Sequence, residues 1–138
     1  MSSYQSYRQS NAREWTRIKM LIELYGELER TLQRGIESDP AETSALAKHQ
    51  LRAMKLFVAV LEGINPEHDE VAANIHRLMV FAMGQLGENT PAAWKSAHGI
   101  VSELLSAFRG IEQEATDLER SGAIPPLPQQ TQYQLSVG

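Results

Sequence analysis

The chain has 138 residues, of which 42% are hydrophobic and 22% charged, proportions typical of a single globular domain. It has no cysteine, which excludes disulfide frameworks, cysteine nucleophiles and thiolate metal sites. A formal net charge of -4 disfavours nucleic acid and anionic membranes as partners, and no apolar run approaches the ~20 residues that cross a bilayer. Since the polar beginning of the chain lacks an apolar signal region, we expect a cytoplasmic protein with no membrane insertion and no nucleic-acid partner.

Prolines divide the chain into helices. Pro40, Pro66 and Pro91 each follow a residue type that caps helices, and proline is tolerated at the first helical position because its missing N–H has no intrahelical partner there. The predicted helices span about 12–36, 40–62, 66–86 and 91–118. Residues 1–11 are predicted to be a flexible N-terminal segment. Residues 121–138, uncharged and with three prolines, are predicted to be a flexible tail.

The predicted helices carry apolar residues in steps of three and four, the period of a helix and not of a strand. In the first helix these are Ile18, Leu21, Tyr25, Leu28, Leu32 and Ile36. In the third helix they are Val71, Ile75, Leu78, Ala82 and Leu86. In the fourth helix they are Trp94, Ala97, Val101, Leu104, Phe108 and Ile111. Since short loops make neighbouring helices antiparallel, the sequence predicts an all-α, antiparallel up-down four-helix bundle over 12–120.

Residues with catalytic or metal-binding spacing are not found in the sequence. A di-iron bundle needs Glu-x-x-His pairs on facing helices and a zinc protease needs His-Glu-x-x-His, and neither pattern occurs. The cluster Glu67–Glu70 has the composition of an acidic first helical turn, a commoner feature than a cation site. We therefore expect a protein that is not an enzyme and that binds no cofactor and no metal.

The first three helices carry more apolar residues than the three in seven that a bundle needs. The extra residues include Leu24, Leu51, Val58, Met79 and Met83, together with Met20 and Phe81. Two interpretations stay open: a wider core, or a surface groove that takes a partner helix through anchors at i, i+3, i+4 and i+7. Methionine suits a groove, because its unbranched side chain repacks against different partners. On the second interpretation, the first five of these residues bind the partner.

Four short motifs follow one another in an order and at a spacing that resemble a known family. They are Tyr4–Tyr7 (Tyr-Gln-Ser-Tyr), Lys19–Tyr25 (Lys-Met-Leu-Ile-Glu-Leu-Tyr), Val71–Ile75 (Val-Ala-Ala-Asn-Ile) and Ala107–Ile111 (Ala-Phe-Arg-Gly-Ile). They are similar to the family's Tyr-x-x-Tyr, Lys-Leu-Ile-x-Met-Leu-Tyr, Ile-Ala-x-Asn-Leu and Ala-Trp-Lys-x-Ile. On these motifs the chain resembles the flagellar secretion chaperones of the FliS family over residues 4–111.

The resemblance implies a cytoplasmic, non-catalytic chaperone of the flagellar type III export pathway. Such a chaperone binds the disordered C-terminal segment of flagellin, prevents premature polymerisation and delivers its cargo to an export gate component, in some cases with a co-chaperone. It also implies that Tyr7 lies across the empty groove and belongs to the partner-binding residues. Thr16–Arg17 stands where the family has Ser-Pro, and Gly26–Glu27 where it has Asp-Gly, as expected of a diverged member.

An alternative function places the same apolar residues against an identical subunit or another helix. The chain would then be a non-enzymatic, oligomerising helical-bundle adaptor or regulator. The chaperone hypothesis predicts a monomer that takes up flagellin, with a dimer as the open alternative. The adaptor hypothesis predicts a stable dimer that excludes flagellin. The sequence leaves both oligomeric states open.

Overall fold

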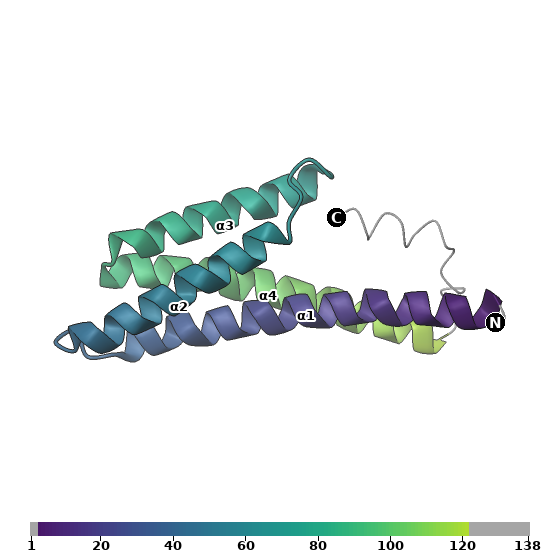
Figure 1. The fold of residues 1–138 in the computed structure, drawn as a ribbon, viewed down its shortest axis with the longest axis horizontal. Coiled ribbons are helices and arrows are strands. Elements are labelled where there is room, and N and C mark those ends of the chain that lie inside the picture. The colour runs from purple at the N-terminus through teal and green to yellow at the C-terminus, as the bar shows by residue number, and fades with distance from the viewer. Residues whose placement is uncertain (1–2, 122–138) are drawn as a thin grey trace.

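The computed structural model describes the backbone of residues 3–121 and the side chains of residues 18–114 and Asp117. It contains four helices and, within the described part, no strand: α1 (Ser3–Glu37), α2 (Thr43–Glu62), α3 (Glu70–Glu88) and α4 (Pro91–Ser121). Each helix packs against its neighbours along the chain, and α1 also packs against α4 (Figure 1). The predicted all-α, up-down four-helix bundle is confirmed. Figure 1 shows the long α1 and α4 extending past the shorter α2 and α3.

The start of α4 agrees with the prediction from proline. Pro91 is its first residue, and the Thr90 hydroxyl accepts a hydrogen bond from the Ala93 N–H at 3.1 Å. This bond satisfies one of the backbone donors that a helix leaves free at its beginning. The sequence therefore located this helix start to the residue.

The starts of α2 and α3 lie later than Pro40 and Pro66, so these two predicted boundaries are wrong. The Asp39 and Asn65 side chains accept hydrogen bonds from backbone N–H groups two residues further on, at 2.9 and 3.0 Å. Such bonds close a turn instead of opening a helix. The helix α3 begins only after Asp69, whose carboxylate accepts from the Ala72 N–H at 2.7 Å.

The helix α1 begins at Ser3, so the predicted start at residue 12 is wrong and the backbone of residues 3–11 is helical. No proline and no glycine interrupts the chain before Gly26, so nothing breaks a helix that has once formed. At the other end of the bundle α4 runs to Ser121, slightly beyond its predicted end. The predicted flexible tail lies outside the described residues apart from Ser121.

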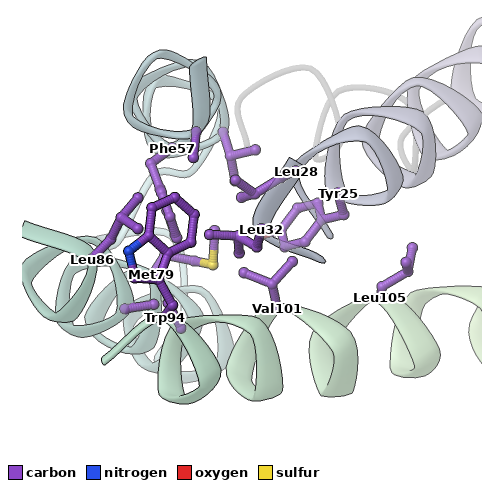
Figure 2. Close-up of a cluster of buried hydrophobic side chains, with 13 residues drawn as sticks. Tyr25, Leu28, Leu32, Phe57, Met79, Leu86, Trp94, Val101 and Leu105 are labelled. Carbon is purple, nitrogen blue, oxygen red and sulfur yellow. The ribbon is translucent and has the colours of Figure 1, made fainter. Parts of the chain in front are cut away.

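The core lies where all four helices meet, and each contributes fully or almost fully buried side chains. Figure 2 shows them pointing toward one another: Tyr25, Leu28 and Leu32 of α1, Phe57 of α2, Met79 and Leu86 of α3, and Trp94, Val101 and Leu105 of α4. The Tyr25 ring meets the Phe108 ring edge-on, with centroids 5.0 Å apart. Burial of such side chains contributes about 1.5–3 kcal/mol each and holds the four helices together.

The core face of α3 differs from the predicted one by one position. Met79 is completely buried, whereas Leu78 is 44% exposed and Val71 still more exposed. Both Leu78 and Met79 fit a helical period with Ala82 and Ile75, so periodicity alone does not decide between them. The structure selects Met79, which corrects both its assignment to an open groove and the assignment of Leu78 to the core.

In α4 the buried residue that follows Val101 is Leu105, and the predicted Leu104 is only half-buried. Ile111, predicted to be the last core residue of α4, is exposed. By register with α3, Ile111 lies near Val71, close to the beginning of that helix. Beyond Ile111, α1 is the one helix of the described chain that α4 can pack against. This explains why Ile111 is exposed.

Glu27 accepts two charge-assisted hydrogen bonds, one of which joins α1 to α2. Its carboxylate accepts from Arg30 on the same helix at 2.8 Å and from Arg52 on α2 at 2.9 Å, with Arg34 at 3.8 Å. The bonds from Arg30 and then from Arg52 hold the pKa of the Glu27 carboxyl below its ordinary value. Because the folded-state pKa is lowered, the stabilisation is present above the pKa of an unfolded glutamate, ~4.3, and is lost as the pH falls through the folded-state pKa.

We expect Glu27→Gln to cause a small loss of stability at neutral pH that disappears in acid. The loss is small because the three arginine side chains are half exposed and solvent screens the pairs. Urea titrations of wild type and variant across this pH range measure it, with Glu103→Gln on the exposed side of α4 as the control. An equal deficit at neutral and acidic pH would contradict the role given to the Glu27 charge.

Candidate partner-binding faces

The helix α3 turns several large apolar side chains to water, with few charged residues among them. From Val71 to Gly87 its one charged side chain is Arg77. Four large apolar side chains of this stretch are exposed: Val71, Leu78, Val80 and Phe81. Apolar sides of a helix are ordinarily covered by neighbouring helices, yet in the described chain α3 packs only against α2 and α4. The exposed apolar surface of α3 therefore marks it as a candidate for contact with a partner.

One apolar face lies over α2 and α3. The Met54 methyl reaches to 3.7 Å from the position a Cβ would take on Gly87, and the Gln50 amide donates to the Leu86 carbonyl at 3.1 Å, so this side of α2 is turned to α3. Residues three and four positions apart lie on one side of a helix. The α2–α3 face accordingly comprises Leu51, Met54 and Val58 on α2 and Val80 and Met83 on α3.

A second apolar face lies over α3 and α4. The Ser102 hydroxyl donates to Glu29 of α1 at 3.3 Å, which turns that side of α4 toward α1. Ile111, nine positions later, is on the opposite side and therefore turned toward α3. On α3, the residues that point away from the α2–α3 face are Val71, Leu78 and Phe81. The α3–α4 face comprises these three residues and Ile111, all exposed.

The predicted partner-binding residues are divided among different environments. Leu51 and Val58 are 58% and 47% exposed and lie together on the α2–α3 face, beside the half-buried Met83. Leu24 is half-buried and packs against the core. Met79 is a core residue, as described above. The Tyr7 side chain lies outside the described residues, so its assignment stays a prediction.

Several residues of the two faces were missed from the sequence. Val80 was not singled out, and Val71, Leu78 and Ile111 were assigned to core stripes although they are exposed. A signal was present, since Arg77 is the one charged residue between Val71 and Gly87 and this stretch has more apolar residues than one core side needs. Counting charges along each helix would have indicated two open faces on α3 instead of one groove.

The acidic segment before α3 forms a helix cap. Asp69 caps α3, and its other carboxylate oxygen lies 3.8 Å from Nε2 of His68. Among the described residues, no group of three or more histidine, aspartate or glutamate side chains is placed to hold a metal ion. None of the described helices has a stretch long and apolar enough to cross a membrane.

Comparison with models of known families, with curated proteins and with solved structures finds no match to this chain. The four-helix architecture therefore rests on the chain's own helices and contacts. The function has to be argued from the two apolar faces and from the order of the sequence motifs.

Proposed function

We propose that this protein is a cytoplasmic export chaperone that holds the disordered C-terminal segment of flagellin on its α2–α3 face. The observation that carries the proposal is the exposure of large apolar side chains on a helix, α3, with a single charged residue between Val71 and Gly87. The order and spacing of the four motifs between Tyr4 and Ile111 support flagellin as the cargo.

The α2–α3 face suits an amphipathic guest helix. Leu51 and Val58 are seven positions apart, which spaces them by about 10 Å along one side of α2. A guest helix uses anchors at the same spacing. Met54 and Met83, both half-buried beside them, have side chains that adjust to guests of different shape. The face thus offers fixed aliphatic contacts flanked by adaptable ones.

Binding of a disordered segment to this face couples folding to association. The guest loses conformational entropy as it becomes helical and gains burial of apolar area, so a large contact coexists with an affinity that allows release. While bound, the segment is kept from polymerising with other flagellin molecules. Release to an export gate component, alone or with a co-chaperone, needs no covalent step.

We expect Val58→Glu and Val80→Glu each to weaken binding of a flagellin C-terminal peptide by about 10- to 100-fold. Each substitution removes ~1.5–3 kcal/mol of apolar burial, and every 1.4 kcal/mol corresponds to tenfold in affinity. Both side chains are nearly half exposed, so the bundle is expected to stay folded. Titration calorimetry measures the affinity, and circular dichroism checks the fold.

Met20→Glu is the control, because Met20 is an exposed apolar residue on α1, away from the α2–α3 face. It is expected to bind the peptide as wild type does. If the wild-type protein does not bind the peptide at micromolar concentration, flagellin is the wrong cargo. A stable dimer that excludes the peptide in light scattering would instead favour the oligomerising adaptor.

A further inference from the structure

The α3–α4 face is longer than its four exposed apolar residues alone suggest. Along α3 it follows Val71, Asn74, Leu78, Phe81 and Gln85, in steps of three and four. None of these five residues is charged, and the one charge beside them is Arg77, which donates to the Asn74 side chain at 3.1 Å. An uncharged chain covers such a strip without removing charges of its own from water, whereas a charged chain would pay that desolvation cost. The face therefore favours an uncharged, partly apolar occupant.

The part of the chain that follows α4 has this chemistry. Segment 122–138 contains no charged residue. Residues 132–137 read Gln-Tyr-Gln-Leu-Ser-Val, a strict alternation of polar and apolar side chains. In an extended chain, alternate residues point to one side, so Tyr133, Leu135 and Val137 would form an apolar edge opposite a polar one.

The dimensions of this segment and of the face agree. Extended at ~3.3 Å per residue, Tyr133 to Val137 spans about 13 Å. Val71 to Phe81, at 1.5 Å per residue of helix, spans about 15 Å. The apolar edge therefore has the length of the exposed strip on α3.

The connection from α4 also has the necessary reach. Because α3 and α4 are antiparallel across Asn89 and Thr90, Val71 lies at about the level of Phe108 and Phe81 at about the level of His98. These levels are about 20 and 35 Å back along α4 from Ser121, at 1.5 Å per residue. The proline-containing stretch from Ser121 to Tyr133 reaches about 37 Å at ~3.1 Å per residue. It is long enough to bring Tyr133 to either end of the strip.

We propose that segment 122–138 folds back along α4 and docks on the α3–α4 face of its own chain, with Tyr133, Leu135 and Val137 against Val71, Leu78 and Phe81. Docking removes this apolar surface from water without any second protein. The proposal is independent of flagellin binding, which uses the other face of α3. It gives the two apolar faces of α3 different occupants.

The absence of cysteine allows a direct test in the full chain. A nitroxide spin label attached at Ser136→Cys, between Leu135 and Val137, broadens the methyl resonances of nearby side chains. We expect the methyl signals of Val71, Leu78 and Ile111 to lose most of their intensity. Those of Leu51 and Val58, on the α2–α3 face, are expected to keep theirs and serve as internal controls.

Adding Leu135→Asp to the labelled chain is expected to restore the Val71 and Leu78 signals, because it places a charge in the apolar edge. The proposal would be overturned if the control signals broadened to the same extent. It would also be overturned if no methyl signal broadened at all. Docking between two copies of the chain is tested in a mixture. One protein carries the spin label, and the other carries no spin label but is isotope-enriched for detection of its methyl groups. Broadening in that mixture would mean that the segment docks on a second copy of the chain, which also overturns it.

Discussion

Replacing Gly35 by alanine is expected to destabilise the bundle by about 2–3 kcal/mol, although alanine is the better helix former. Gly35 lies in α1 directly beneath the indole of Trp94 on α4. A Cβ at this position would meet Cζ3 of the ring at an impossible distance and would lie 2.6 Å from both Cε3 and Cη2. The helices α1 and α4 approach each other this closely because residue 35 has no side chain.

The indole cannot move aside without breaking other contacts. Trp94 is 3% exposed, and its Nε1 donates to the Asn89 side chain at 2.8 Å. Asn89 in turn adopts the left-handed conformation with φ of 55° at the end of α3, and its backbone N–H donates to the Leu86 carbonyl at 3.1 Å. Displacing the ring therefore disturbs the whole corner between α3 and α4. The strain from the added methyl group exceeds the ~1 kcal/mol that alanine gains over glycine within a helix.

Urea titrations give the free energy of unfolding, and Gly99→Ala on α4 is the matched control. Gly99 is exposed and has no atom within contact distance of an added Cβ, so this variant is expected to gain ~0.5–1 kcal/mol. A double-mutant cycle with Trp94→Leu tests the cause, because shrinking the ring removes the clash. If Gly35→Ala costs as much beside Leu as beside Trp, the close approach described here is not the reason.

The number, order and direction of the helices were predicted from the sequence, because they depend on local patterns. These patterns are the spacing of apolar residues and the helix start at Pro91. The contact of Gly35 with Trp94 could not be foreseen, since it depends on how far apart two helices pack. The Asp39 and Asn65 turns were also missed. In both, a side chain of a cap-forming type accepts a hydrogen bond from the backbone N–H two residues later and forms a turn. Only the hydrogen-bond geometry distinguishes such a turn from a helix cap.

The candidate site was predicted in part. The extra apolar residues of α2, Leu51 and Val58, are open, which decides for these two residues against the wider core that the sequence left possible. On α3 the assignment was wrong by one residue. Since residues 78–83 of α3 are all apolar, the sequence around Leu78 and Met79 holds no contrast between a core side and a water side. Only packing against α2 and α4 selects Met79 for the interior.

This selection gives the last prediction, on two adjacent residues of α3. Met79→Lys is expected to cost more than about 4–5 kcal/mol, because it places a charge without a partner in the core. Leu78→Lys is expected to cost far less, about 1 kcal/mol, because residue 78 lies outside the core and the change weakens only its proposed contact with segment 122–138. Against a domain stability of 5–15 kcal/mol, the first change unfolds much of the protein and the second leaves it folded.

Thermal melts followed by circular dichroism separate the two variants, and Met79→Leu, which keeps the volume and the apolar character, is the control expected to melt close to wild type. The opposite order would mean that α3 is turned by about 100° about its axis, the angle between successive helical residues. Leu78 would then be in the core, and the exposed residues of α3 would no longer be Val71, Val80 and Phe81. Both apolar faces depend on this rotation of α3, so this pair of variants tests the common basis of the flagellin site and of the docked segment without any flagellin present.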